Sequence, residues 1–174
     1  MKIIVAVDSF KGCLTSAQAG QAVEEAVRCC CPEADVVTCV VSDGGDGMLE
    51  AFCRAYGAKL HTVSVHDPLM RPIQARYGIT AHGMAIIESA QACGLTLMSA
   101  DERNPLRATT YGVGEMVADA VRRGCRSFIV GLGGSGTSDA GMGMLRALVD
   151  AFAPAGGHID DVLSGQMADC SFTL

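Results

Sequence analysis

The sequence predicts an α/β fold made of two parts, and three observations support this. As far as residue 58, β-branched segments alternate with segments whose apolar residues recur every three or four positions, which is typical of a parallel sheet covered by helices. From residue 59, several extended segments follow one another without a helix, which favours antiparallel or mixed pairing. Polar loops follow three of the predicted strands, at the edge where open α/β sheets bind ligands.

The first part, residues 1–58, contains two predicted strands and two predicted helices. Each strand is a short run rich in β-branched residues, which we expect to be buried on both faces: 3–7 and 36–41. Apolar side chains at helical spacing predict the helices: 15–31 and 49–56. Thr15 and Gln18 form a capping box at the start of the first helix, and Gly57 is a suitable end for the second.

The change of pattern predicts a domain boundary near residue 58, with a second α/β domain over residues 59–174. We expect its extended segments at 59–65, 71–79, 84–88 and 127–130. Helical spacing predicts its helices at 110–123 and 144–152. The pattern weakens after residues 156–157, and residues 171–174 resemble the start of a strand that is cut short.

Composition excludes several classes of protein. The chain has 174 residues, of which 49% are hydrophobic and 18% charged, so an intrinsically disordered chain is excluded. The net charge is −6 and the arginines are scattered, which argues against a nucleic-acid partner. No apolar run approaches the ~18 residues that suggest a membrane span, so we expect no membrane partner and a cytoplasmic location. The odd number of cysteines, nine, favours reduced thiols over a disulfide scaffold.

The first polar loop, residues 8–12, combines a carboxylate, a hydroxyl and a cation at Asp8, Ser9 and Lys11. A lysine in this position can meet a phosphate or a carboxylate as a point charge. The alternative is a solvated turn in which Asp8 accepts hydrogen bonds from nearby backbone N–H groups. The position of the loop at the end of a predicted strand favours the functional interpretation.

The second loop, residues 43–47, contains three glycines and two carboxylates, Asp43 and Asp46. Glycines let the backbone approach a ligand closely, and Mg²⁺ in proteins is usually held by one or two carboxylates together with phosphate oxygens. An ordinary turn would have a similar composition. We therefore expect either a magnesium site or a simple turn here.

The third loop, residues 131–141, follows a strand and opens a helix, which suits an anion cradle at a helix N-terminus. It matches G-x-G-x-x-G, but no acidic residue ends a following strand about 20 residues on, which argues against a dinucleotide site. No lysine follows Gly136, so a Walker loop is excluded. The candidate phosphate-binding residues of this loop are Gly133, Gly134, Ser135 and Thr137.

Two further polar residues have both a structural and a functional interpretation. Asp139 can cap the helix that follows the third loop, or act on a substrate hydroxyl, and the two roles are compatible. Thr110 precedes another predicted helix and is either its cap or part of a ligand loop. Glu88 ends an apolar segment, where a buried and an exposed position are equally expected.

Taken together, these stretches resemble the bacterial glycerate kinase family, whose members phosphorylate D-glycerate. They occur in order over nearly the whole chain: VDSFKG (7–12), SDGGDG (42–47), DPL (67–69), NPL (104–106) with ATTYG (108–112), and GGSGTSDAG (133–141). The resemblance implies ATP and Mg²⁺ as cofactors, 2-phosphoglycerate as the favoured product, and a flavodoxin-like domain into which a second domain with a mixed sheet is inserted. With these implied ligands, Lys11 and Asp139 become the catalytic candidates.

Members of the family are considerably longer than this chain. We therefore expect a truncated second domain, no kinase activity from the 174 residues alone, and self-association of the chain through unpaired sheet edges. The alternative to a kinase is a non-catalytic α/β fragment that binds glycerate or nucleotide.

Overall fold

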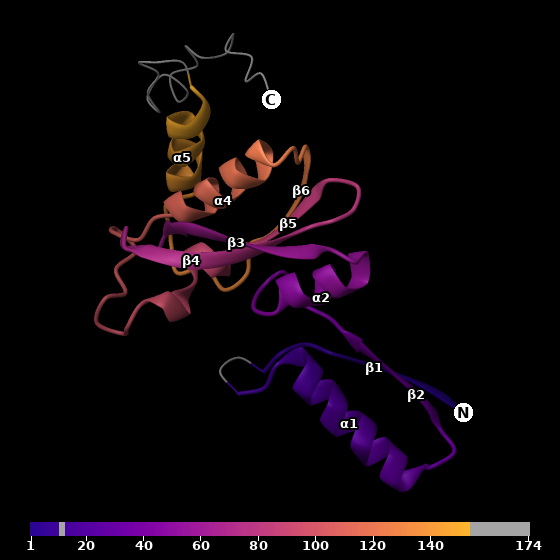
Figure 1. Ribbon diagram of the computed structural model, residues 1–174. Helices are drawn as coiled ribbons and strands as arrows, with labels where there is room; N and C mark the ends of the chain where they lie inside the picture. Colours follow the sequence, from indigo (N-terminus) through magenta and orange to yellow (C-terminus); the bar gives the residue numbers. More distant parts are fainter. Residues whose placement is uncertain (11–12, 154–174) are drawn as a thin grey trace.

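The computed structural model describes residues 1–10 and 13–153 and has the predicted α/β architecture (Figure 1). Its strands are β1 (Lys2–Val7), β2 (Asp35–Val40), β3 (Lys59–His66), β4 (Pro72–Ile79), β5 (Met84–Glu88) and β6 (Ser127–Gly131). Its helices are α1 (Ser16–Cys30), α2 (Met48–Tyr56), α3 (Ala90–Cys93), α4 (Tyr111–Arg122), α5 (Met142–Phe152) and the short 3₁₀ helix η1 (Leu95–Leu97). The strand-like residues 171–174 lie outside the described residues.

The first sheet consists of β1 and β2, paired in parallel as the alternation of elements predicts. Helix α1 connects them and packs on one face around a small cluster formed by Val5, Ala34 and Val36. The predicted capping box is present: the Thr15 side chain accepts the N–H of Gln18, and the Gln18 side chain accepts the N–H of Thr15.

The expectation that both strands of this sheet are buried on both faces is wrong for the described residues. Val5 faces α1 and is 4% exposed, whereas its neighbour Ile4 is 65% exposed and Val37 on β2 is 38% exposed. Successive side chains of a strand point to opposite faces, and α1 covers one face only.

The second sheet has the strand order β3-β4-β5-β6. The pairs β3–β4 and β4–β5 are antiparallel, and β5–β6 is parallel, which confirms the mixed sheet predicted for this part. A parallel pair requires a crossover connection, and here the connection from β5 to β6 carries α3, η1 and α4.

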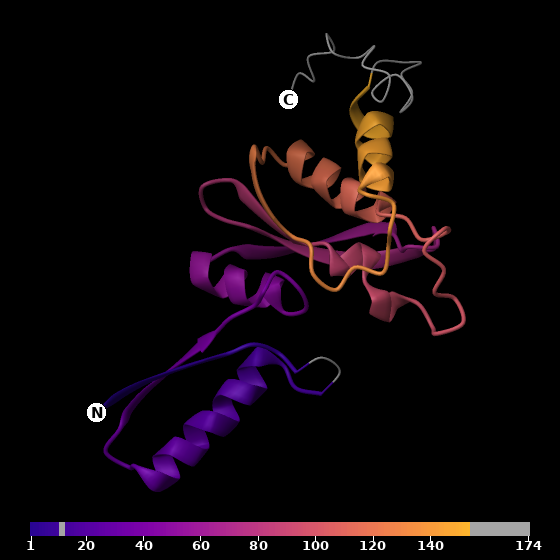
Figure 2. The ribbon, with the colours of Figure 1, turned by 180° about the vertical axis from the view of Figure 1, so that it is seen from behind.

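Helices cover both faces of the second sheet (Figures 1 and 2). On one face α4 packs over the core that contains Tyr77, Ile87 and Met116, and α5 packs on α4. On the opposite face α2 contributes Met48 and packs against Ile86. Helix α2 thus contacts β4 and β5, and the domain boundary near residue 58 stays a prediction.

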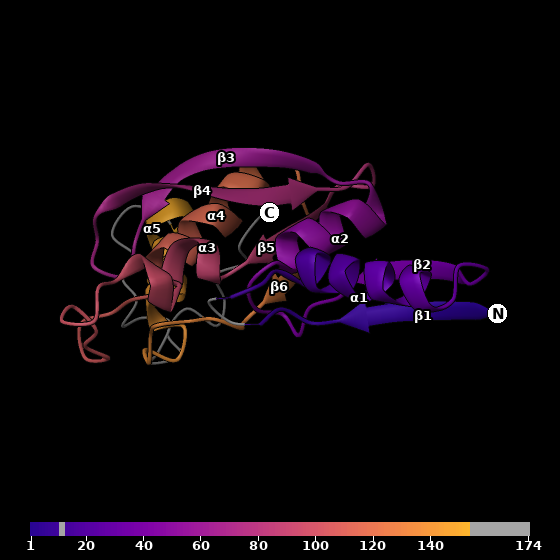
Figure 3. The same cartoon turned by 90° about the horizontal axis from the view of Figure 1, so that it is seen from below.

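Seen from below, β1, β2 and α1 extend toward one end of the molecule, and α3, α4 and α5 gather at the other (Figure 3). No helix within the described residues has the length and apolar character needed to cross a bilayer. The eight cysteines that lie within the described residues all carry free thiols.

Candidate active site

Two of the predicted ligand loops are in direct backbone contact. The 43–47 loop connects β2 to α2, and the glycine-rich loop runs from β6 to α5. The N–H of Gly133 donates a hydrogen bond of 2.9 Å to the carbonyl of Gly44. A Cβ added to Gly133 would overlap the backbone of Gly45, so this close approach requires glycine at position 133.

Both carboxylates of the 43–47 loop are exposed beside this contact. Asp43 accepts the N–H of Gly45 at 2.9 Å through Oδ1. The Oδ1 atom of Asp46 lies 3.0 Å from where a Cβ on Gly134 would be, so Asp46 borders the glycine-rich loop. The tertiary structure therefore brings Asp43 and Asp46 next to the Gly133–Gly134 backbone, about ninety residues away in sequence.

The loop after β1 also lies near Asp46. Ser9 lines a cavity of about 250 Å³ together with Asp46. Asp8 lies at the exposed end of β1, where its Oδ1 accepts the N–H of Ser9 at 2.7 Å. Lys11 lies outside the described residues, so its place in the candidate site remains a prediction from the sequence.

The hydroxyls of the glycine-rich loop lie at its outer turn. The oxygen atoms of the Ser135 and Thr137 side chains are 2.8 Å apart and hydrogen-bonded. Within the described residues, the backbone N–H groups of Gly134 and Ser135 have no protein acceptor. The two backbone donors, and the one hydroxyl hydrogen that this pair does not use, are thus available to an anionic ligand.

The segment from α3 to η1 forms backbone hydrogen bonds with the glycine-rich loop. The N–H of Leu95 donates to the carbonyl of Gly134 at 3.0 Å, and the N–H of Gly136 donates to the carbonyl of Cys93 at 2.8 Å. Neither short helix is predicted by the sequence. With four and three residues, respectively, they are too short to show a helical period.

Asp139 links the beginnings of α4 and α5. Its carboxylate accepts hydrogen bonds from the N–H and hydroxyl of Thr110 at 2.8 and 2.9 Å. It also accepts the N–H groups of Gly143 at 3.0 Å and Gly141 at 3.1 Å, and the hydroxyl of Thr109 at 3.3 Å. The predicted residues Asp139 and Thr110 therefore meet, as one hydrogen-bonded unit.

These contacts determine the charge of Asp139. Burial tends to raise its pKa, but the hydrogen bonds from Thr110, Gly143 and Gly141 outweigh burial and lower the pKa below its ordinary value. The carboxylate is consequently ionised near neutral pH and is a weak base. Within the described residues, no hydrogen bond links Asp139 or Thr110 to the 43–47 loop, so the two groups of predicted site residues are separate.

Glu88, which the sequence left open, is buried at the end of β5 and is 4% exposed. Its Oε2 accepts the N–H of Leu49 at 2.9 Å, in the first turn of α2. Gly47, the residue that precedes α2, has no side chain to cap the helix, and Glu88 supplies the cap from the neighbouring sheet. A lone acidic residue at the end of an apolar strand was the available signal.

The chain is similar to known proteins of one family. A family model described as the glycerate kinase family matches residues 3–169. A glycerate kinase from Haemophilus influenzae is 42% identical over 149 residues, which are 85% of this chain and 39% of that protein. A glycerate 2-kinase from Escherichia coli K12 is 41% identical over 160 residues, or 91% of this chain and 42% of that protein.

A solved structure agrees with these sequences. The crystal structure of a protein described as glycerate kinase 2 from Salmonella typhimurium LT2 matches with a TM-score of 0.68 and 38% identity. The match covers 85% of this chain and 40% of the Salmonella chain. The present chain thus spans about two fifths of the length of these relatives.

Proposed function

We propose the following function for this chain, which belongs to the glycerate kinase family. The protein to which these residues contribute transfers the γ-phosphoryl group of ATP to D-glycerate in the cytoplasm. Phosphoryl transfer depends mainly on positioning and on neutralising charge, so exposed carboxylates, hydroxyls and free backbone donors are the groups it needs.

The observation that carries the proposal is the contact between the two loops. Gly133 donates to Gly44, and Asp46 borders Gly134. A carboxylate that can bind a metal ion therefore adjoins a loop whose Gly134 and Ser135 N–H groups have no acceptor among the described residues. A nucleotide phosphate with its metal ion needs a carboxylate for the metal and N–H donors for the phosphate oxygens, close enough for one ligand to reach both. Gly133, Gly134, Ser135 and Thr137 form the phosphate cradle of this proposal.

Asp43 and Asp46 suit Mg²⁺ because both are exposed carboxylates, the hard oxygen ligands this ion prefers. Within the described residues no group of three or more metal-binding side chains occurs. Two carboxylates are nevertheless sufficient, since Mg²⁺ usually keeps waters and takes phosphate oxygens as further ligands. When bound, the ion would neutralise charge on the phosphates.

For the remaining predicted residues we propose distinct roles. Lys11, with Asp8 and Ser9 beside it, meets the transferred phosphate or the substrate carboxylate as a point charge. Asp139 and Thr110 together hold the end of the glycine-rich loop in place, because their hydrogen bonds join the start of α4 to the start of α5. Its lowered pKa and its hydrogen bonds from backbone and hydroxyl groups support orientation over proton abstraction.

The test replaces the matching segment of Escherichia coli glycerate 2-kinase with this chain. We expect the folded chimera to consume ATP only in the presence of D-glycerate, and to form 2-phosphoglycerate, identified by phosphorus NMR. Asp46→Asn in the chimera should lower kcat/KM at least about a hundredfold. Glu33→Gln, which removes an exposed carboxylate on a turn after α1, is the matched control.

Three results would each contradict a part of the proposal. A chimera that melts cooperatively but shows no D-glycerate-dependent turnover would exclude the substrate. Wild-type kinetics for Asp46→Asn would remove Asp46 from the metal site. Formation of 3-phosphoglycerate would leave the kinase activity in place and exclude the proposed product.

A further inference from the structure

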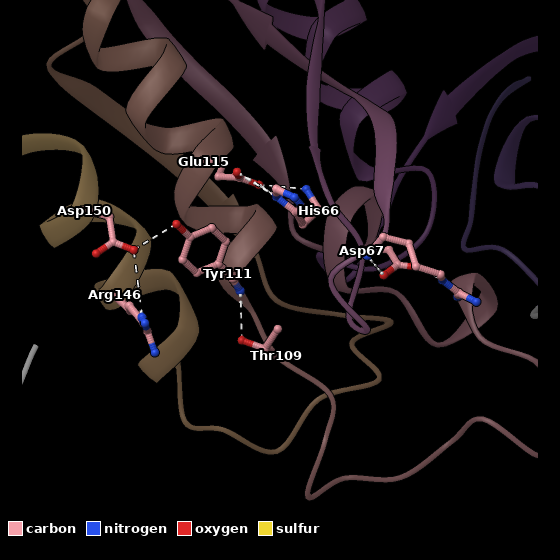
Figure 4. Close-up of polar contacts among 8 residues, drawn as sticks. His66, Asp67, Thr109, Tyr111, Glu115, Arg146 and Asp150 are labelled. Carbon is pink, nitrogen blue, oxygen red and sulfur yellow. Dashed lines mark hydrogen bonds and ion pairs between the residues drawn. The ribbon is translucent and has the colours of Figure 1, made fainter.

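A cavity of about 410 Å³ lies between the loop after β3 and the start of α5. We call it the arginine pocket and define it by the lining residues Met70, Arg107, Thr109, Tyr111 and Arg146, with Gly143 and Asp150 completing the lining. Figure 4 shows Arg146 and Asp150 on α5 beside the ring of Tyr111 on α4. None of the site residues predicted from the sequence lines this cavity.

The two arginines of the pocket have unused hydrogen-bond donors. Within residues 1–10 and 13–153, the Arg107 side chain forms neither an ion pair nor a hydrogen bond. The Nε atom of Arg146 forms an ion pair with Oδ2 of Asp150 at 3.9 Å, a distance too long for a hydrogen bond, so its N–H donors stay available. Some other arginines have a close carboxylate partner, as Arg71 has in Asp67 and Arg123 in Asp119.

The acidic residue of the pocket is already occupied. The Tyr111 hydroxyl donates a hydrogen bond of 2.9 Å to Oδ2 of Asp150. The two arginines and one aspartate leave the lining with a single net positive charge. A monoanion with two equivalent oxygens therefore matches both the charge and the donors of the pocket.

The pocket shares a wall with the Asp139 unit. The Thr109 hydroxyl donates to Asp139 at 3.3 Å. It also accepts the N–H of Tyr111 at 3.2 Å (Figure 4). A Cβ added to Gly143 would overlap the Thr109 hydroxyl oxygen, so α5 meets this loop at close range. A ligand in the pocket would thus lie against the segment that ends the glycine-rich loop.

We propose that the arginine pocket binds the carboxylate of a small organic acid, which under the proposed function, on which this assignment rests, is D-glycerate. Guanidinium groups match the geometry of a carboxylate with paired N–H donors. The groups that we propose for phosphate binding lie elsewhere, in the backbone and hydroxyls of the glycine-rich loop. The exposed Met70 side chain gives the pocket an apolar edge for the carbon chain of the acid.

The experiment titrates the ¹⁵N-labelled 174-residue chain with D-glycerate, propionate and inorganic phosphate, followed through the arginine Nε–H and backbone amide signals. We expect D-glycerate to shift the signals of Arg107, Arg146 and Thr109. Arg107→Gln and Arg146→Gln should each weaken binding about tenfold, since each removes charge-assisted hydrogen bonds. Arg103→Gln, in the same exposed loop but outside the lining, should leave the affinity unchanged.

The possible results separate this inference from the proposed function. Unchanged D-glycerate affinity in both pocket variants would overturn the pocket and leave the kinase assignment in place. Propionate binding that depends on Arg107, with no binding of D-glycerate, would support a carboxylate pocket and exclude the proposed substrate. Tighter binding of inorganic phosphate than of either acid, or no shift with any ligand, would overturn the carboxylate assignment.

Discussion

At the scale of single residues, Glu88 has one of the best-defined roles in the molecule. Its carboxylate is buried between β5 and the start of α2, where it accepts the N–H of Leu49. Glu88→Ala leaves the N–H of Leu49 buried without an acceptor, so we expect the free energy of unfolding to fall by about 1–3 kcal/mol. Urea denaturation followed by circular dichroism measures this change.

Two further variants make the Glu88 prediction specific. Glu88→Gln keeps an oxygen acceptor and should lose less stability than Glu88→Ala. Glu50→Ala removes an exposed carboxylate from the same helix and should change stability little. Equal losses for Glu88→Ala and Glu50→Ala would show that the hydrogen bond to Leu49 does not stabilise α2.

Asp139 predicts a dependence of stability on pH. Its pKa is lower in the folded chain than in an unfolded one, so ionised Asp139 stabilises the fold above the unfolded pKa of about 4. This stabilisation is lost as the pH falls through the folded pKa. We therefore expect Asp139→Asn to be less stable than wild type at pH 7, with a difference that shrinks below about pH 4. Melting temperatures from pH 7 to pH 2 would test this, and a constant difference would contradict it.

At the scale of elements, the contact between the two glycine-containing loops depends on backbone shape. Gly133→Ala would place a methyl group against Gly45, so we expect the loops to separate and the unfolding free energy to fall by about 1–3 kcal/mol. The signals of residues 43–47 should shift in the NMR spectrum of the variant. Leu132→Ala, at a neighbouring position that is 76% exposed, is the control and should leave those signals in place.

At the scale of the whole molecule, the small sheet has one covered face and one exposed face. Ile4 and Val37 lie on the exposed face. An open apolar groove is lined by Ile3 of β1 and Val23 of α1. Exposed apolar surface favours association, so we expect the 174-residue chain to self-associate at micromolar concentration. Ile4→Lys with Val37→Lys should reduce this in sedimentation velocity, while Leu106→Lys in an exposed loop should not. A strictly monomeric wild-type chain would contradict the prediction.

The same sheet predicts how the chain behaves in a kinase assay. Two ligand loops follow β1 and β2, and a sheet of two strands is marginally stable without further strands or a larger packed face. We therefore expect no measurable ATP- and D-glycerate-dependent turnover from the 174 residues alone. A coupled assay at high enzyme concentration measures it, with the Escherichia coli glycerate 2-kinase chimera as positive control. Robust turnover by the chain would refute this expectation.

The longer elements of this protein and their order could be predicted from the sequence, because caps and side-chain periods are local properties. Thr15 and Gln18 mark the start of α1, Gly57 ends α2, and the run of extended segments after residue 58 predicts the antiparallel strands. The polar loops were predicted in the same way, from residue types within a few positions of one another. Helices α3 and η1 were missed because they are shorter than the period that reveals a helix.

Which of these loops meet could be seen only from the packing of the elements. Gly44 and Gly133 touch because the chain folds α2 against β5, beside which β6 lies. The same packing buries Glu88 under α2, and the crossing of α4 with α5 places Thr110 against Asp139. Spacing along a chain carries no information about such distances, since strand order and helix packing set them through contacts between residues far apart in sequence.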